Sequence, residues 1–170
     1  MGELRHVIIY TDGACLGNPG PGGYAAILLH GNLRTELSGG FRRTTNNRME
    51  IMAAIAGLEA LKEKCRVTLY SDSQYLVKAI SRGWAQRWRA HGWKRNKREK
   101  ALNPDLWQRL LQLCHYHDVQ FRWVKGHAAT PENRRCDELA MQAAGQPNLP
   151  PDVGYISAGE AEQSAQYGLL

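Results

Sequence analysis

The sequence lacks any long hydrophobic run. No apolar stretch approaches the roughly 20 residues that a helix needs to cross a membrane. The opening residues, MGELRHVIIYTDG, hold only a short apolar patch and no small-residue cleavage site, which predicts that there is no export signal. Hydrophobic residues make up 43% and charged residues 22% of the 170, as is usual for soluble proteins. We therefore expect a soluble protein with one core.

Cysteine is scarce and does not have the spacing of a zinc site. The four cysteines are far apart and none belongs to a C-x-x-C pair. A domain of this length needs no disulfides to fold, so the pattern favours free thiols in a reducing, cytoplasmic setting. The sequence also contains no internal repeat and no low-complexity block.

Positive charge is concentrated in one segment. The net charge is +6, but the window 82–100 contains eight Lys or Arg residues against one acid, Glu99, so it alone carries +7. Trp84, Trp88 and Trp93 are interleaved with these cations. The basicity is therefore local. A solvated charged helix whose tryptophans belong to the core is one interpretation of this segment.

The hydrophobic periodicity predicts an α/β protein whose antiparallel strands come first and whose parallel strands follow. The expected strands are His6–Asp12, Tyr24–His30, Leu33–Phe41, Arg66–Ser71 and Val119–Val124, with a loop at Gly17–Gly23. The expected helices are Asn46–Lys64, one that starts at Asp72 or Ser73, one that starts at Asn103-Pro104-Asp105, and Asn133–Ala144. After Gln146 the chain loses its periodicity, which predicts a domain over residues 1–147 and a mobile tail over residues 148–170.

Two predicted strands end in an aspartate. Asp12 and Asp72 each follow a Tyr-Thr or Tyr-Ser pair, and the ends of parallel neighbouring strands lie at one edge of a sheet. Each acid also has a simpler interpretation: Asp12 as part of an Asp-Gly turn, Asp72 as a helix N-cap, and Asp137 as an acid in the first turn of a helix. The pattern of these acids alone does not decide between the interpretations.

Glu50 favours a metal site. It resembles the last residue of a capping box that starts at Asn47, yet its neighbours Met49, Ile51 and Met52 lie on an apolar helix. A buried carboxylate without a partner costs several kcal/mol, and a metal ion would remove that cost. Oxygen ligands favour Mg²⁺ or Mn²⁺, and two such ions roughly 4 Å apart could activate water in phosphodiester chemistry.

Four motifs resemble bacterial-type ribonuclease HI in order and spacing. They are YTDGACLGNPGPGGYAAIL, TTNNRMEIMAAIAGLEAL, YSDSQYL and WVKGHAATPENRRCDELA, and the similarity extends over about residues 5–147. The resemblance implies an RNase H-like fold, with a five-stranded mixed sheet flanked by helices. It also implies a metal-dependent endonuclease that cleaves the RNA strand of RNA/DNA hybrids and leaves 5′-phosphate and 3′-hydroxyl ends.

The resemblance also implies the site residues. The metal-binding catalytic carboxylates would be Asp12, Glu50, Asp72 and Asp137, which would hold two Mg²⁺ ions (or Mn²⁺) together with the substrate. His127 would assist proton transfer or product release. Ala129 departs from the glycine that the family usually has two positions after this histidine.

The hybrid-binding residues are implied in the same way. Asn18, Asn46, Asn47 and Gln74 would contact sugars and minor-groove edges, and Arg43 and Thr45 would lie near a DNA phosphate. Residues 82–102 match the basic protrusion of the family, which we call the handle; the cations would bind phosphates without sequence preference. The residues of the handle expected to bind the hybrid are Trp84, Trp88, Lys94, Arg95, Lys97 and Arg98.

Two other functions are compatible with parts of the pattern. One is another nuclease or strand-transfer enzyme of the same fold, such as a junction resolvase or an integrase, and the TTNNRME segment, the handle and His127 argue against it. The other is a non-catalytic nucleic-acid-binding module, which would not need all four acids. We expect a monomer that requires no protein partner.

Overall fold

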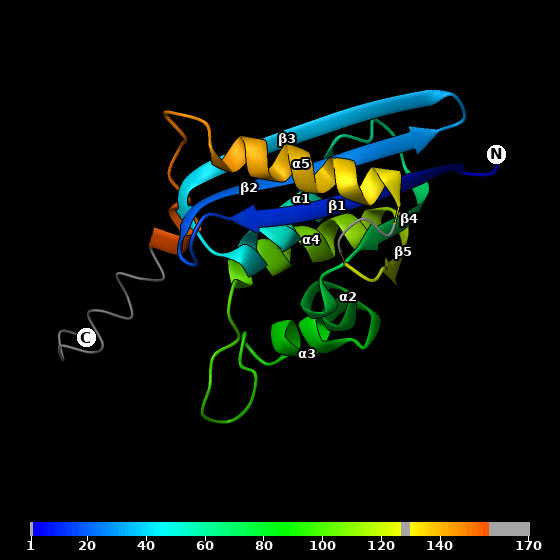
Figure 1. Cartoon of the computed structure of the whole chain (residues 1–170). Coiled ribbons are helices and arrows are strands. Elements are labelled where there is room, and N and C mark those ends of the chain that lie inside the picture. The colour runs from blue at the N-terminus through cyan, green and yellow to red at the C-terminus, as the bar shows by residue number, and fades with distance from the viewer. Residues whose placement is uncertain (1, 127–129, 157–170) are drawn as a thin grey trace.

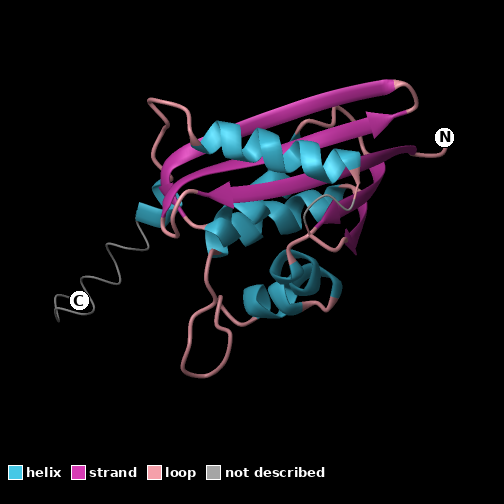
Figure 2. Ribbon diagram, viewed as in Figure 1, coloured by secondary structure: helices cyan, strands magenta, loops and turns pink. Residues whose placement is uncertain are grey.

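The computed structural model describes residues 2–126 and 130–156. Its centre is a five-stranded sheet in the order β3-β2-β1-β4-β5, which Figure 1 shows with its helices and Figure 2 by type of secondary structure. The strands are β1 (Arg5–Cys15), β2 (Gly20–His30), β3 (Leu33–Thr44), β4 (Cys65–Ser71) and β5 (Asp118–Trp123). The predicted mixed α/β architecture is confirmed.

The pairing of the strands follows the predicted change of direction. β1, β2 and β3 form an antiparallel meander, and β4 pairs in parallel with both β1 and β5. The hairpin between β2 and β3 has a two-residue connection, in which Gly31 takes a positive φ of 58° that glycine adopts without strain. Tyr10 of β1 pairs with Tyr70 of β4, so the residues that follow these two tyrosines lie at the same edge of the sheet.

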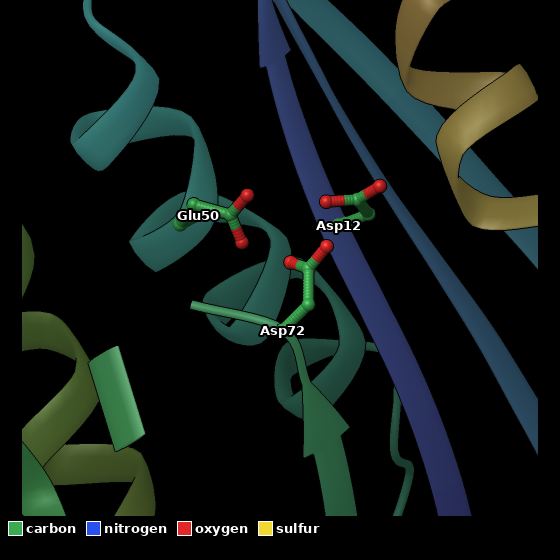
Figure 3. A group of neighbouring side chains, drawn as sticks. All are labelled: Asp12, Glu50 and Asp72. Carbon is green, nitrogen blue, oxygen red and sulfur yellow. The ribbon is translucent and has the colours of Figure 1, made fainter. Parts of the chain in front are cut away.

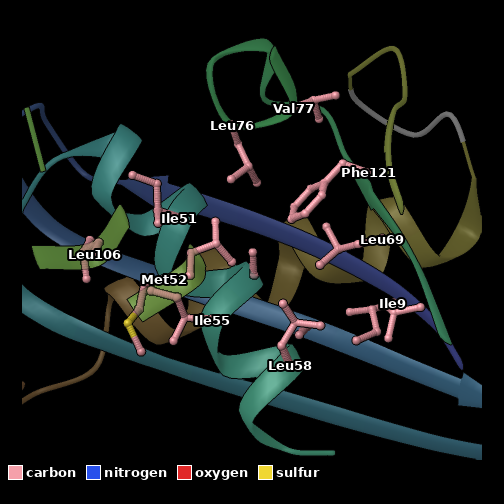
Figure 4. Packing of buried hydrophobic residues seen from close by; sticks show 14 of the residues in the cluster. Ile9, Ile51, Met52, Ile55, Leu58, Leu69, Leu76, Val77, Leu106 and Phe121 are labelled. Carbon is pink, nitrogen blue, oxygen red and sulfur yellow. The ribbon is translucent and has the colours of Figure 1, made fainter. Parts of the chain in front are cut away.

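Helices cover both faces of the sheet (Figure 1). They are α1 (Asn46–Glu59), α2 (Gln74–Ser81), α3 (Trp84–Ala90), α4 (Pro104–Tyr116) and α5 (Pro131–Ala144). α5 packs on the meander from one side, and a small apolar cluster that includes Ile27, Cys136 and Ala140 fills that interface. The larger core lies on the other face, where Figure 4 shows Leu58 of α1 on the side of Ile9 of the sheet and Ile55 beside Met52. No helix in the described part of the chain is long and apolar enough to span a membrane.

Several predicted boundaries differ from the structure, and the two largest differences concern the first helix and the first loop. The first helix ends at Glu59 rather than Lys64. Although residues 60–64 are good helix formers, the chain needs them to reach β4 at Cys65. The loop predicted at Gly17–Gly23 is shorter, because β2 already starts at Gly20. Gly23 lies so close to α5 that a Cβ there would collide with the carbonyl of Ala140.

The segment that follows α5 packs against the domain as far as Gly154, two residues before the last described residue. The backbone N–H of Arg42 donates a hydrogen bond to the Pro150 carbonyl at 2.9 Å, and Asp152 is buried. This part departs from the predicted mobile tail. Its anchor is a single acid in an otherwise aperiodic stretch, which hydrophobic periodicity cannot detect. Residues 157–170 lie outside the described part of the chain.

Candidate metal and nucleic-acid site

Three acidic side chains converge at one edge of the sheet. Asp12 lies near the end of β1, Asp72 directly follows β4, and Glu50 lies in the second turn of α1. Figure 3 shows their carboxylates pointing toward one another. One carboxylate oxygen from each lies within 4.8 Å of the others. The register of β1 and β4 explains the first pair, since each aspartate comes two residues after the paired tyrosines.

The backbone of Gly13 holds two of these carboxylates. Its N–H donates to Asp12 Oδ1 at 2.9 Å and to Glu50 Oε1 at 3.1 Å. A side chain would not fit, because a Cβ on Gly13 would lie 2.5 Å from the backbone nitrogen of Glu50. Glycine therefore allows α1 to approach β1 closely enough for Glu50 to reach Asp12.

Burial makes this cluster electrostatically costly. Asp12 and Glu50 are each only 4% exposed. Burial, followed by the negative charge of Asp72, raises the pKa of Asp12 from 3.8 to about 7. Burial and the charges of Asp12 and Asp72 raise the pKa of Glu50 well above its usual range. In both cases the low-dielectric setting and the like charges disfavour the ionised form.

The cluster fits a divalent cation. Within the described residues, Glu50 Oε2 is buried and has no hydrogen-bond partner, although a buried carboxylate oxygen normally has one. A cation would give this oxygen a partner and would also relieve the repulsion that raises the pKa of Asp12. The donors are all oxygens, which suits Mg²⁺ or Mn²⁺ rather than zinc.

The remaining predicted catalytic residues lie outside this group of three. Asp137, on α5, is half-buried. Its charge also raises the pKa of Asp12, so it lies near the cluster, but it is not among the carboxylates within 4.8 Å of one another. His127 and Ala129 lie outside the described residues.

The simpler interpretations of the acids do not fit the structure. Asp12 is not in a turn, because β1 continues to Cys15. The N-cap of α2 is Ser73 rather than Asp72. Asp137 lies beyond the first turn of α5, since that helix begins at Pro131.

The capping box does not form either. The N-cap of α1 is Thr45, whose side chain accepts a hydrogen bond from the N–H of Arg48. A capping box that starts at Thr45 would therefore end at Arg48, two positions before Glu50. Glu50 contributes to no helix cap, which leaves the carboxylate cluster as its setting.

Most of the predicted minor-groove residues gather at the junction of β3 and α1. Asn46 and Asn47 are exposed on the first turn of α1, and Asn18 Oδ1 accepts a hydrogen bond from the Asn46 N–H at 3.1 Å. Arg43 is exposed at the end of β3 next to Thr45. Gln74 lies elsewhere, exposed at the start of α2, where its side chain accepts a hydrogen bond from Lys78.

The handle combines a packed base with an exposed cationic tip. Trp84 and Trp88 are half-buried and pack against the main core, and Trp88 contacts the ring of Trp107 at 6.1 Å between centroids. The four cations predicted to bind the hybrid are all exposed: Lys94, Arg95, Lys97 and Arg98. Arg95 forms an ion pair with Glu99. A cavity of about 910 Å³ lies between α3 and the tip, and its lining includes Trp84, Trp88 and Lys94.

Sequence reasoning missed three residues that support the site. Gly13 was interpreted as a turn glycine. Trp123 donates its indole N–H to the backbone carbonyl of Asp72 at 3.2 Å, a contact that no local pattern reveals. Arg48 is 2% exposed, and its position beside Met49 in an apolar helix was the available signal.

Comparisons with known proteins agree with this geometry. The family model described as RNase H matches residues 5–145. A ribonuclease H of Syntrophus aciditrophicus is 71% identical over 151 residues, covering 89% of this chain and 87% of the relative.

Solved structures share the fold. The crystal structure of LC9-RNase H1, a type 1 RNase H with the type 2 active-site motif, has a TM-score of 0.74 and 31% identity, covering 85% of this chain and 74% of that one. LC11-RNase H1, solved in complex with an RNA/DNA hybrid, has a TM-score of 0.63 and 24% identity, covering 81% of this chain and 96% of that one. At that identity the likeness concerns the fold alone. The match of the family model over most of the chain and the high identity to a named ribonuclease H place this protein in the RNase H family.

Proposed function

We propose that this protein is an endoribonuclease that hydrolyses the RNA strand of RNA/DNA hybrids with the help of divalent metal ions. The observation that carries the proposal is the carboxylate cluster, in which Glu50 Oε2 is buried with no partner among the described residues. The cluster lies at one edge of the sheet, and the same domain presents an exposed cationic handle. An anionic polymer bound to the handle and a metal bound by the acids together define a nuclease of this family.

The chain supplies the metal ligands in a fixed arrangement. Asp12, Glu50 and Asp72 would hold Mg²⁺, or Mn²⁺ in its place, and Asp137 would complete the set from α5. When bound, the metal polarises the scissile phosphate and lowers the pKa of the attacking water. Gly13 keeps Asp12 and Glu50 oriented through its N–H, so the ligands need no large rearrangement when the metal binds. Hydrolysis of the P–O3′ bond leaves a 5′-phosphate and a 3′-hydroxyl.

The surface around the cluster suits a hybrid duplex. An enzyme that distinguishes a hybrid must recognise the 2′-hydroxyls of one strand and the deoxyribose geometry of the other across a minor groove. Asn46 and Asn47 present short polar side chains next to Glu50 for this purpose. Arg43 and Thr45 would bind a DNA phosphate, and the handle would bind further phosphates of the DNA strand. Asn18 and Gln74 would extend the minor-groove contacts.

The proposal also includes a role for His127, the cellular compartment and the oligomeric state. His127 would accept or deliver a proton during cleavage or product release. All four cysteines are free thiols, which suits a reducing cytoplasm. We propose a monomer that acts without an obligatory protein partner.

Cleavage of labelled duplexes tests this function. The protein with Mg²⁺ is incubated with an RNA/DNA hybrid, a DNA duplex and an RNA duplex of one sequence, and the product ends are identified. We expect cleavage of the RNA strand of the hybrid alone, with 5′-phosphate ends. Asp12→Asn should abolish this cleavage while hybrid binding persists, whereas the matched change Asp118→Asn, at an exposed residue of β5, should not affect it.

Each alternative predicts a different result. Cleavage of branched or fully DNA substrates would identify a strand-transfer enzyme or a resolvase of the same fold. Binding of hybrid without cleavage at any concentration of Mg²⁺ or Mn²⁺ would identify a binding module. Normal turnover by the Asp12→Asn protein would refute the metal site itself.

A further inference from the structure

A buried arginine joins three distant segments close to the proposed site. Arg48 lies in the first turn of α1, two residues before Glu50, and is 2% exposed. Its guanidinium donates to both carboxylate oxygens of Asp152 at 2.7 and 2.9 Å and to both of Asp105 at 2.7 and 2.9 Å. It also donates to Asn103 Oδ1 at 3.3 Å. These five hydrogen bonds match the five N–H donors of the group.

The charged state of Arg48 and the charged state of its carboxylate partners stabilise each other. Burial alone would lower the pKa of Arg48, but its hydrogen bonds to Asp105 and Asp152 outweigh burial and hold the guanidinium charged. Burial would likewise raise the pKa of Asp105, and the pairing with Arg48 lowers it instead. Removing one carboxylate leaves a buried cation with incomplete compensation, so each acid is needed to keep Arg48 in place.

Residues 150–156, which we call the strap, supply one of these acids and fix it to β3. The Thr44 hydroxyl donates to Asp152 Oδ2 at 2.7 Å. Near a bulge in the pairing of β2 and β3, the Arg42 N–H donates to the carbonyl of Pro150. Gly154 lies directly on the ion pair, where a Cβ would collide with the Asp105 carboxylate and with Arg48 Nη2. The strap therefore covers the Arg48 network.

Two of the three segments joined in this way lead to parts of the proposed hybrid-binding surface. Thr44 and Arg48 flank the junction of β3 and α1, which presents Arg43 and Thr45. Asn103 and Asp105 lie where the chain leaves the handle and enters α4. The strap itself contains none of the proposed metal ligands and none of the four cations of the tip. Asp152 bonds to Thr44 and Arg48 on the side of the junction. Arg48 in turn bonds to Asn103 and Asp105 on the side of the handle, so Asp152 is linked to the handle through Arg48.

We propose that Asp152 is a positioning residue that increases the affinity for hybrid by holding the handle and the β3–α1 junction in one register. This inference rests on the proposed function. A duplex that contacts two surfaces gains from both only when their spacing matches its own. Loss of Asp152 should therefore weaken hybrid binding while the carboxylates, held by Gly13 and β1, still support turnover.

The test measures KM and kcat on hybrid for Asp152→Asn and Gly154→Ala, with Asp118→Asn as the matched control. Asp152→Asn removes one charge from the network, whereas Gly154→Ala displaces the strap without changing any charge. Each is combined with a handle variant in which Lys94, Arg95, Lys97 and Arg98 are replaced by glutamine. All assays are run at a temperature at which circular dichroism shows each variant folded. If Asp152→Asn does not fold, Gly154→Ala supplies the same comparison.

We expect each strap variant to raise KM about fivefold in the otherwise unchanged protein, a size typical of residues that share one interaction network, with kcat within about twofold. In the handle variant the same change should raise KM less than about twofold, because no handle contact remains to be misplaced. If Asp152 served folding alone, a strap variant would raise KM by the same factor in the unchanged protein and in the handle variant, and this result would overturn the inference. An unchanged KM in the strap variants would also overturn it. Failure of the unchanged protein to cleave hybrid would instead refute the proposed function.

Discussion

Replacing Asp12 with asparagine should make the metal-free protein more stable at alkaline pH while abolishing hydrolysis. Asp12 is 4% exposed, and its carboxylate lies beside those of Glu50 and Asp72. Its ionisation therefore costs free energy in the folded state that it does not cost in the unfolded chain. Asparagine keeps an oxygen that can accept the Gly13 N–H but carries no charge. The substitution removes the repulsion and preserves the hydrogen bond.

The size of the effect follows from the pKa of Asp12, which is about 7 in the folded protein against an ordinary value of 3.8. Because the folded state binds the proton more tightly, the stabilising contribution of this group is complete below about pH 4 and is lost as the pH rises through about 7. The whole difference is worth about 4 kcal/mol, of which about 2 kcal/mol is lost between pH 5.5 and pH 8. The asparagine variant lacks this titration, so its advantage over the parent should grow by that amount.

Urea denaturation in the presence of a chelator measures this difference at several pH values. The free energy of unfolding of the parent should fall relative to that of Asp12→Asn as the pH rises, and Asp118→Asn should follow the parent. Saturating Mg²⁺ should flatten the pH dependence of the parent, because a ligand that binds the folded state alone stabilises it. If the parent and Asp12→Asn keep a constant difference from pH 5.5 to pH 8 without metal, the electrostatic account of the cluster is wrong.

Three further predictions concern the site. Gly13→Ala places a Cβ 2.5 Å from the backbone of Glu50, so urea denaturation should show a loss of about 1–3 kcal/mol and kcat should fall sharply. Replacing Lys94, Arg95, Lys97 and Arg98 with glutamine should raise KM and reduce the slope of log KM against log salt concentration, and unchanged values would exclude the handle from binding. Chelation should abolish cleavage, Mg²⁺ should restore it, and activity that persists without metal would contradict the proposed chemistry.

The sequence predicted the architecture because local patterns determine most of it. β-branched runs defined the strands, and the spacing of Asp12 and Asp72 after paired tyrosines placed both at one sheet edge. Glu50 was recognisable because a charged residue in an apolar helix needs a partner. These inferences need only periodicity and the cost of burying charge. They placed Asp12 and Asp72 together and marked Glu50 as a candidate ligand, whereas the full set of acids was implied by the resemblance to ribonuclease HI.

Contacts between distant segments were beyond such patterns. Gly13 resembles a turn glycine in sequence, and only the close approach of α1 shows that it holds the carboxylates. Asp152 stands in a stretch with no periodicity, and its partner Arg48 is 104 residues away. A mobile tail was the natural prediction for that stretch, because a single buried ion pair leaves no repeated signal along the chain.

The cost of burying a charge applies to both Arg48 and Glu50, yet the two residues have different roles. Arg48 is fully compensated by Asp105 and Asp152, so it is stable as it stands and can serve as a fixed anchor. Glu50 has an oxygen with no partner among the described residues and lies beside two further acids. A buried charge whose hydrogen bonds and counter-charges all lie within the fold can hold segments together. A buried charge without such partners favours the binding of an external ion. Arg48 and Glu50 are two residues apart on α1. Arg48 anchors the helix to Asp105 and Asp152, whereas Glu50 provides a carboxylate oxygen that a cation would bind.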